Sequence, residues 1–207
     1  MTNVSIIGIG NMGGAITGIL AKGGASVQVV ARDLARAQEL AGSTGATAAS
    51  FGDALTGDIV VLAIPFPAVD DVIAAYGDQL VGKTIVDITN PVDFDTFDGL
   101  VVPSDASAAA VIAEKVPGAT VVKAFNTNFA ATLATGQVGD AATTVLVAGD
   151  DADAKQALIA AIEAGGLQAA DAGTLKRARE LEAVGFLQMG LASSGATSWT
   201  SGFAVHA

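Results

Sequence analysis

Cysteine is absent from this chain of 207 residues, and the single histidine, His206, lies one residue from the C-terminus. The absence of cysteine excludes disulfide bonds, thiolate catalysis and cysteine-ligated metal sites. One histidine excludes histidine-based catalytic triads and multi-histidine metal sites, and a histidine at a chain end is expected to be solvated and idle. We therefore predict no metal site, and we name no catalytic side chain.

Basic residues are also scarce. Ten lysines and arginines stand against 21 aspartates and glutamates, which gives a formal net charge of −11 at pH 7. Such a chain has little with which to neutralise a phosphate backbone, so we do not expect nucleic acid as a partner. The scarcity also makes each cation near a predicted phosphate site informative.

The chain lacks a long apolar run. The longest uncharged apolar stretch near mid-chain, residues 59–69, is broken by Pro65 and Pro67, whereas a membrane-spanning helix needs about 20 apolar residues. The N-terminus leads directly into a predicted strand, without a basic segment, an apolar segment and a cleavage site. We therefore expect no membrane association and a cytoplasmic location.

Strand and helix patterns alternate along the chain. They predict strands at 3–9, 26–31, 46–49, 58–64, 84–88, 120–124, 143–148 and 168–170, and helices at 12–22, 34–41, 68–76, 106–115, 152–164 and 175–192. Segments 90–103 and 125–140 are expected to be loops, the second with a short helical piece. Successive βα units predict an α/β fold of the Rossmann type: a doubly wound, mostly parallel sheet with a small C-terminal helical appendage.

A G-x-G-x-x-G pattern follows the first predicted strand and opens the first predicted helix. It consists of Gly8, Gly10 and Gly13, with Asn11 and Met12 before the last glycine. In this context the first glycine permits a tight turn, the second lets a pyrophosphate approach the backbone, and the third allows helix and strand to pack closely. Free N–H groups at the helix N-terminus would bind the pyrophosphate. The alternative is a structural glycine turn in an unrelated α/β protein.

The end of the second predicted strand indicates which dinucleotide is bound. Enzymes that use NAD usually carry an acidic residue there, and it would repel a 2′-phosphate. Here the strand ends with Ala31 and Arg32, and Arg36 follows one helical turn later. A small residue and two guanidinium groups suit the 2′-phosphate of NADP. Asp33 opposes that charge, but we expect it to act as the N-cap of the following helix.

The ends of the later strands are expected to form the rest of the dinucleotide-binding cleft, because ligands of open parallel sheets lie beyond the carboxyl ends of the strands. This places three segments along the cofactor: Ile64-Pro65-Phe66, Thr89-Asn90-Pro91 and Ala124-Phe125-Asn126-Thr127. The two asparagines have donors and acceptors for a ribose or a carboxamide. The alternative is that they only form turns, as asparagine commonly does at strand ends.

These segments and several others occur in the same order as the sequence motifs of a known protein family. The glycine loop, Ala31-Arg32 and Ile64-Pro65 are followed by similar stretches at 82–83, 86–91 (VDITNP), 122–127 (VKAFNT), 148–152, 171–175 and 178–182. Over nearly its whole length the chain resembles the NADPH-dependent coenzyme F420 reductases, also called F420-dependent NADP oxidoreductases. It is also similar to the cytosolic reductase part of the STEAP ferric reductases, which passes electrons to a flavin.

The resemblance implies hydride transfer between the nicotinamide of NADP(H) and deazaflavin coenzyme F420. It assigns Gly10, Asn11 and Met12 to the pyrophosphate, Arg32 and Arg36 to the 2′-phosphate, Pro65, Asn90 and residues 124–127 to the nicotinamide end, and Phe66 and Phe125 to the wall of the acceptor pocket. The chain departs from the family at Ala31, where serine is frequent, and at Asn128 and Phe129. Lys83 and Lys123 are expected to be ordinary solvated lysines.

Other functions stay open at this point. One is NADPH-dependent reduction of a flavin, a ferric chelate or a small carbonyl or imine, for which Lys123 and Tyr76 are the candidate proton donors. Another is a non-enzymatic NADP sensor. We expect residues 1–172 to form the NADP-binding Rossmann domain, and residues 173–207 to complete the acceptor site or an interface. A homodimer through the 175–192 helix is considered, because little later chain remains to cover its apolar face.

Overall fold

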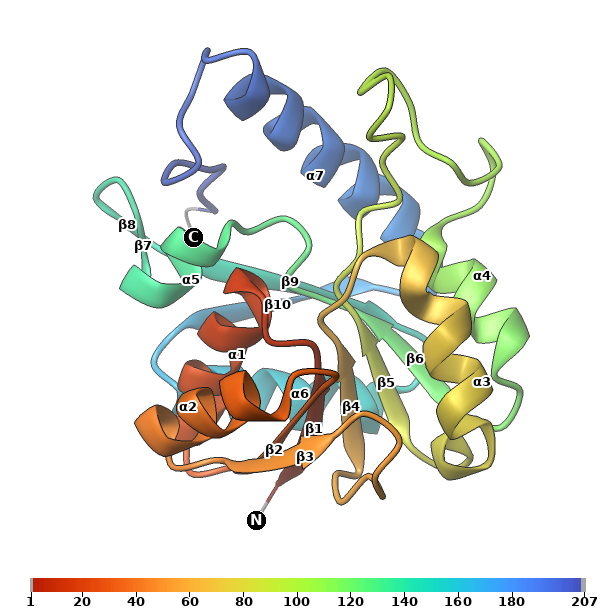
Figure 1. Ribbon diagram of the computed structural model, residues 1–207. Coiled ribbons are helices and arrows are strands. Elements are labelled where there is room, and N and C mark those ends of the chain that lie inside the picture. Colours follow the sequence, from red (N-terminus) through yellow and green to blue (C-terminus); the bar gives the residue numbers. More distant parts are fainter. Residues whose placement is uncertain (1, 206–207) are drawn as a thin grey trace.

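An eight-stranded sheet runs through the centre of the computed structural model, which describes residues 2–205 (Figure 1). Its strands are β1 (Asn3–Ile7), β2 (Ser26–Ala31), β3 (Thr47–Ser50), β4 (Ile59–Leu62), β5 (Thr84–Asp87), β6 (Thr120–Lys123), β9 (Thr144–Gly149) and β10 (Gln168–Gly173). Their order is β10-β9-β6-β5-β4-β1-β2-β3, and every neighbouring pair is parallel except β6 and β9. The predicted mostly parallel, doubly wound sheet is confirmed.

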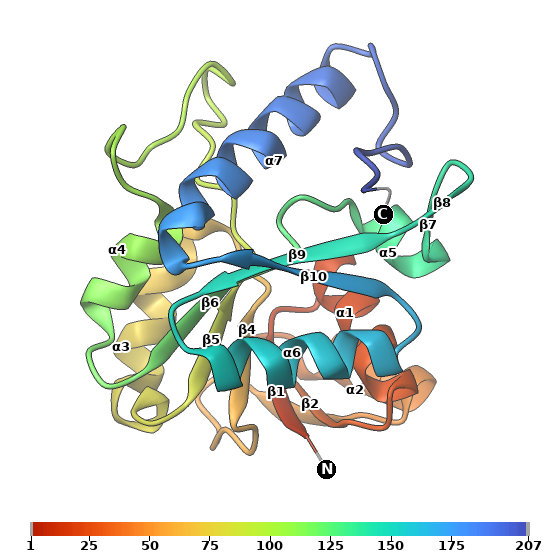
Figure 2. The same cartoon turned by 180° about the vertical axis from the view of Figure 1, so that it is seen from behind.

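Helices cover both faces of this sheet (Figures 1 and 2). They are α1 (Asn11–Lys22), α2 (Leu34–Thr44), α3 (Val69–Leu80), α4 (Ala108–Lys115), α5 (Ala130–Thr135), α6 (Ala152–Ala164) and α7 (Ala178–Ser193), with short 3₁₀ turns η1 (Phe66–Ala68) and η2 (Leu175–Arg177). One apolar core lies between the sheet and α1, α2 and α6, and a second lies between the sheet and α3 and α4. Consecutive residues of β4 serve different cores: Val61 lies in the first and Val60 in the second.

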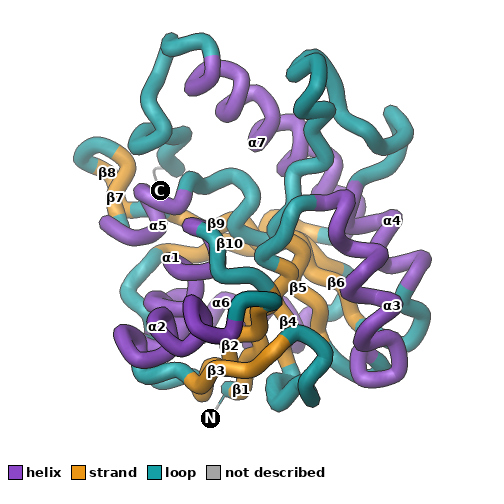
Figure 3. The backbone as a smooth tube through the Cα atoms, viewed as in Figure 1, coloured by secondary structure: helices purple, strands orange, loops and turns teal. Residues whose placement is uncertain are grey.

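The order in which strands are added to the sheet reverses between β1 and β4, which makes this the topological switch point. From β1 it extends through β2 to β3 on one side, and it then returns to build β4, β5 and β6 on the other. Such a switch point leaves a crevice at the carboxyl ends of the two central strands, which is where ligands of open α/β sheets bind. Loops gather along this edge, and α7 lies beyond them (Figure 3).

Several boundaries differ from the sequence prediction. Helix α3 continues past Gly77 to Leu80, because Tyr76 and Leu80 are both buried on the helix face that packs against the sheet. The predicted 175–192 helix is a 3₁₀ turn followed by α7, and β10 is longer than the predicted 168–170 strand. A small hairpin, β7 (Gln137–Val138) and β8 (Ala141–Ala142), was not predicted. It turns at Gly139, whose φ is 59°.

Helix α7 packs directly on the carboxyl edge of the sheet. The Asn126 side-chain amide donates a hydrogen bond to the Leu181 carbonyl at 2.9 Å. A Cβ added at Gly185 would lie 2.6 Å from Asn90 Oδ1 and 2.9 Å from the Asn126 carbonyl oxygen, so only glycine allows this approach. The helix is therefore held against the two asparagines that follow β5 and β6, Asn90 and Asn126.

The chain after α7 folds back toward α5. The rings of Trp199 and Phe129 have centroids 5.0 Å apart, and the Phe203 backbone N–H donates to Gln188 Oε1 at 3.2 Å. His206 lies outside the described residues. Within residues 2–205, each helix is too short or too polar to cross a bilayer.

The contact at Gly185 generates a prediction. Gly185→Ala is expected to lower the free energy of unfolding, although alanine raises helix propensity by about 1 kcal/mol, because the new Cβ forces α7 away from Asn90. Gly190→Ala in the same helix is the matched control: its Cβ meets no neighbour, so it is expected to stabilise. Urea unfolding of both variants checks this, and a stabilised Gly185→Ala would contradict the close docking.

Candidate functional site

Two glycines of the first loop are required by the fold itself. Gly8 follows β1 with a φ of 111°, and a Cβ there would lie 2.1 Å from the Ala63 carbonyl oxygen. A Cβ on Gly13 would lie 2.1 Å from the Gly8 carbonyl oxygen. Both positions therefore need glycine so that β1, β4 and α1 can approach one another.

Gly10 is different, because protein packing does not explain it. It is exposed, and a Cβ added to it would meet no protein atom within 4 Å. It is also the N-cap of α1 and supplies no side-chain hydrogen bond, whereas Asp33 and Asp151 cap α2 and α6 with their carboxylates. The uncapped N–H groups of the first turn of α1 therefore face the crevice, in the arrangement that binds phosphate oxygens.

Two arginines stand at the end of β2 and the start of α2. Arg32 is exposed, lies 2.7 Å from the Asp71 carboxylate and has its guanidinium 5.4 Å from the centre of the Phe51 ring. This surface ion pair is weak and leaves Arg32 free to exchange partners. Arg36 is exposed one turn later, and Asp33 accepts its backbone N–H at 3.2 Å. The N-cap role expected for Asp33 is confirmed.

A cavity of 620 Å³ opens beyond the carboxyl ends of the central strands. Nine of the residues predicted for the site line it: Gly10, Asn11, Met12, Ile64, Pro65, Phe66, Thr89, Asn90 and Asn126. Sequence reasoning missed a second group from three distant segments: Phe94, Asn128, Phe129, Met189, Trp199 and Thr200. The only signal for any of these was that Asn128 and Phe129 depart from the family pattern. No local pattern marks Trp199 or Met189.

Phe125 does not line this cavity. Its side chain is fully buried in the core, and its φ of 62° is unusual for a residue with a Cβ. The Asn126 N–H donates to the Ala124 carbonyl at 2.8 Å, so the chain makes a γ-turn at Phe125. This turn directs the phenylalanine inward and carries the chain on to Phe129, whose ring lines the cavity instead. Ala124 and Thr127 are buried as well, and Pro91 is buried behind Asn90.

The asparagines at the floor of the cavity bond to each other. Asn126 Nδ2 donates to Asn90 Oδ1 at 2.9 Å, and Asn90 Nδ2 donates to the Asn126 carbonyl at 2.9 Å. Three buried side-chain oxygens lack a hydrogen-bond partner in the described structure: Thr89 Oγ1, Asn126 Oδ1 and Asn128 Oδ1. All three belong to residues that line the cavity. Unpartnered buried polar atoms are costly, so their grouping fits a polar ligand such as a carboxamide.

Comparison with known proteins agrees with this geometry. Residues 3–91 match the family model described as NADP oxidoreductase, coenzyme F420-dependent. The F420-dependent NADP reductase of Methanocaldococcus jannaschii is 30% identical over 65% of this chain and 62% of its own length. A crystal structure of a proposed F420-dependent NADP reductase from Arthrobacter sp. FB24 superposes over 100% of both chains, with a TM-score of 0.85 and 26% identity. These matches bear out the resemblance to the F420-dependent NADP oxidoreductases that the sequence motifs indicate.

A longer relative shares the same region. The metalloreductase STEAP3 of Rattus norvegicus is 32% identical over 87% of this chain, which corresponds to 36% of the rat protein. The chain therefore spans about a third of that relative and about three-fifths of the Methanocaldococcus enzyme. These matches show the fold and the resemblance to NADP-dependent reductases, and they do not identify the acceptor.

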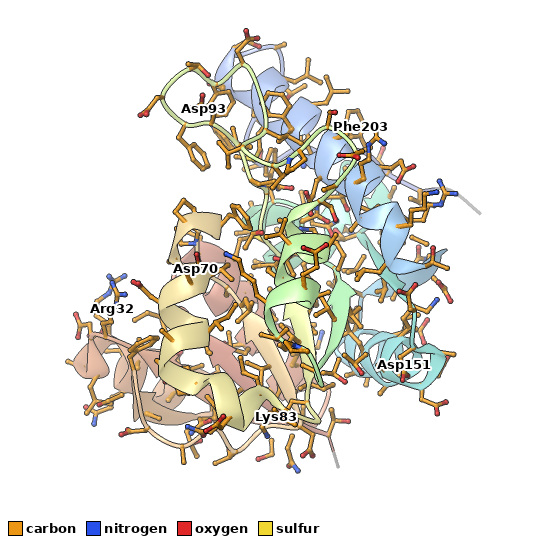
Figure 4. All side chains as sticks on the ribbon, turned by 90° about the vertical axis from the view of Figure 1, so that its right-hand side faces the viewer. Arg32, Asp70, Lys83, Asp93, Asp151 and Phe203 are labelled. Atoms are coloured by element: carbon orange, nitrogen blue, oxygen red, sulfur yellow. The ribbon has the colours of Figure 1, made fainter. Side chains whose placement is uncertain are left out.

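The lysines expected to be solvated are placed differently. Lys123 is fully buried, and its Nζ lies 2.8 Å from Asp87 Oδ2 and 2.8 Å from Glu182 Oε1. The expectation for Lys123 was wrong, because it ends a central strand that α7 covers. Burial raises the pKa of Glu182, while Lys123 and the Ala108 N–H oppose that shift. Lys83 Nζ donates to the Gly57 carbonyl at the opposite edge of the sheet (Figure 4).

Neither candidate proton donor lies in the cavity. Lys123 is held between two carboxylates below the cavity, and the Tyr76 hydroxyl accepts the Gly52 N–H at 2.6 Å on the α3 side. Burial raises the pKa of Tyr76. Among the described residues that line the cavity there is no lysine, arginine, aspartate or glutamate.

The position of Gly10 generates a prediction. Gly10→Ala is expected to fold normally, since its φ of −68° and its open surroundings accept a Cβ, and to weaken NADPH binding by about tenfold or more, because the methyl group occupies the pyrophosphate approach. Gly77→Ala, on the exposed side of α3, is the control and leaves binding unchanged. Calorimetric titration with NADPH and thermal melts measure both. Normal NADPH affinity in Gly10→Ala would remove the assigned role of this loop.

Proposed function

We propose that this protein transfers a hydride between NADP(H) and deazaflavin coenzyme F420 in the cavity at the sheet switch point. One observation carries the proposal: a single cavity joins an uncapped helix N-terminus to a wall of aromatic side chains. Gly10, Asn11 and Met12 of the helix N-terminus line it, and so do the rings of Phe66, Phe94, Phe129 and Trp199. The helix N-terminus suits a dinucleotide, and the aromatic rings suit a flat ring system.

The dinucleotide lies along the carboxyl edge in this proposal. The first turn of α1 binds the pyrophosphate, and Arg32 and Arg36 bind the 2′-phosphate beside Ala31. The nicotinamide then reaches the strand ends, where Ile64 and Pro65 pack against the ring. The unpartnered oxygens of Thr89 and Asn126 are placed to bind its carboxamide.

In this proposal the side chains that line the cavity position the nicotinamide and the acceptor ring, and they transfer no proton. When bound, NADPH supplies a hydride from its nicotinamide to a ring carbon of the acceptor, and solvent supplies the proton that completes the two-electron reduction. The cavity contributes stacking surfaces, a fixed nicotinamide and the partial exclusion of water. Holding two rings in contact can account for roughly 7–11 kcal/mol of a barrier. A described lining without lysine, arginine, aspartate or glutamate suits this chemistry.

Residues 173–207 complete the acceptor end in this proposal. Met189 of α7 and Trp199 and Thr200 of the following segment line the cavity, while residues 1–172 supply the whole dinucleotide surface. Trp199 packs against Phe129. Residues 173–207 therefore add to an acceptor surface that Phe66, Phe94 and Phe129 of residues 1–172 also form, and both parts share one cavity.

A flavin is the second candidate acceptor. The aromatic side chains that line the cavity can stack against a flavin ring as well as against the deazaflavin ring of F420. The similarity to STEAP3, a metalloreductase that matches 87% of this chain, also supports an acceptor other than F420. Reduction of a carbonyl or an imine is less well supported, because the lining residues offer no acidic proton donor.

An absorbance assay tests the acceptor. Protein and NADPH are mixed with coenzyme F420, and separately with riboflavin, and the absorbance of each acceptor is followed. Loss of the F420 band at a much higher kcat/KM than the flavin band supports the proposal. Faster reduction of riboflavin would favour a flavin reductase. Tight binding of NADPH without reduction of either acceptor would favour a non-enzymatic sensor.

Dinucleotide preference gives a second prediction. Arg32→Gln is expected to raise the Kd for NADPH roughly ten- to a hundredfold, because a charge-assisted contact is worth about 1.5–3 kcal/mol, and to leave NADH binding unchanged. Lys115→Gln is the matched control, since Lys115 is also a surface cation paired with an aspartate of α3, here Asp70. Titration of both variants with both dinucleotides measures the preference. Equal losses for NADH and NADPH would rule out a 2′-phosphate contact.

A further inference from the structure

We propose that Asp87 and Lys123 are positioning residues for the nicotinamide, and that they act through Thr89 without contacting the dinucleotide. Together they hold the Thr89 backbone so that its hydroxyl oxygen accepts an N–H of the nicotinamide carboxamide. This inference rests on the proposed function, because it takes the nicotinamide to lie at the ends of the strands. It gives a buried ion pair a part in selecting the carboxamide, in addition to its part in the fold.

The first observation is that one ion pair holds both backbone polar groups of Thr89. Asp87 accepts the Thr89 N–H through Oδ1 at 2.8 Å, and it accepts Lys123 Nζ through Oδ2 at 2.8 Å. Lys123 Nζ also donates to the Thr89 carbonyl. All three residues are buried, so water does not compete for these contacts. A satisfied buried network of this kind makes the backbone rigid, and the rigid backbone sets the direction of the Thr89 side chain.

The second observation is that the hydroxyl of the same residue makes no hydrogen bond. Thr89 lines the cavity, and its Oγ1 is buried without a partner in the described structure. Buried hydroxyl groups usually have a partner, because an unpaired one costs free energy. Thr89 therefore combines a firmly held backbone with an oxygen that can accept a hydrogen bond from a ligand in the cavity. A carboxamide N–H is a donor of the required kind.

A similar arrangement occurs at the end of β10. Asp171 Oδ1 accepts the Gly173 N–H at 2.7 Å and Lys155 Nζ at 2.7 Å, and Lys155 Nζ donates to the Gly173 carbonyl at 3.1 Å. An aspartate and a lysine thus again hold both backbone groups of the residue two positions after the aspartate. The residue held here is a glycine, and none of the three lines the cavity. This pair can fix only backbone, which makes it a matched control for the pair at Asp87.

Two analogues of the dinucleotide isolate the contribution of the carboxamide. The 3-acetylpyridine analogue of NADP⁺ has a methyl group in place of the amide NH₂, and 2′-phospho-ADP-ribose lacks the nicotinamide. Calorimetric titration without an acceptor gives the Kd of each ligand. The Kd of the acetylpyridine analogue divided by the Kd of NADP⁺ measures recognition of the N–H group. In the unsubstituted protein we expect this Kd ratio to be about five, because the analogue loses one hydrogen bond.

Asp87→Asn is the test variant. Its amide has a single oxygen where the carboxylate uses two, so either the Thr89 N–H or Lys123 Nζ faces an NH₂ group. We expect the Kd ratio to fall toward unity, while the Kd of 2′-phospho-ADP-ribose stays unchanged. Asp171→Asn is the same substitution in the control pair, and it is expected to leave the Kd ratio at its original value. Thermal melts record the loss of stability in both variants.

A double-mutant cycle tests whether Asp87 acts through Thr89. Thr89→Val removes the hydroxyl group and is expected to lower the Kd ratio by itself. Adding Asp87→Asn to Thr89→Val is then expected to change the ratio no further, because the group through which Asp87 acts is gone. If Asp87→Asn does not fold, Lys123→Met with Glu182→Gln removes one charge of each sign together with the donor to the Thr89 carbonyl, and the same fall in the ratio is expected.

The outcomes separate this inference from the proposed function. A Kd ratio near unity in the unsubstituted protein, an unchanged ratio in folded Asp87→Asn or in Thr89→Val, or additive effects of these two substitutions would overturn the inference. An ion pair that only supports the fold would lower the melting temperature and leave the ratio alone. Reduction of coenzyme F420 by NADPH would still support the hydride-transfer function in each case. Conversely, a ratio that depends on Asp87 through Thr89 would support the inference even if the absorbance assay showed no turnover.

Discussion

A buried lysine holds the functional half of this molecule together. Lys123, at the end of β6, bonds to Asp87 at the end of β5 and to Glu182 in α7, and all three side chains are almost completely excluded from solvent. Glu182 also accepts the Ala108 and Ala109 N–H groups at the start of α4. Loss of one member of such a cluster leaves uncompensated buried charge, which typically costs 3–5 kcal/mol. Two strands and two helices are therefore joined at one point directly below the cavity.

The acceptor wall depends on this attachment. Once Glu182 and the Asn90–Asn126 pair fix α7, Met189 reaches the cavity, and the segment after α7 returns to place Trp199 against Phe129. The phosphate-binding surface needs none of these contacts, since the glycine loop precedes α1 and the two arginines lie between β2 and the first turn of α2. The cavity thus combines a surface built by the local βα unit with a surface assembled from distant segments.

Charge is distributed unevenly around the cavity. The cations Arg32 and Arg36 lie outside it, between β2 and the first turn of α2, while the described residues that line it carry unpartnered oxygens and no charged side chain. Within a chain of net charge −11, this arrangement concentrates attraction for phosphate at one position. It leaves the ring-binding end to packing and dispersion, which suits chemistry that requires alignment more than acid or base groups.

The sequence by itself determined the order and type of the main elements, the glycine loop and the arginines after β2. These features depend on local periodicity, on backbone constraints at Gly8 and on charge next to a strand end, all of which are readable within a few residues. Only the tertiary structure decided that Phe125 turns into the core while Phe129 lines the cavity, that Lys123 is buried, and that Trp199 completes the wall. Each of these outcomes depends on contacts between segments far apart in the chain, such as β6 with α7 or α5 with residues 194–205, and no local pattern encodes such pairings.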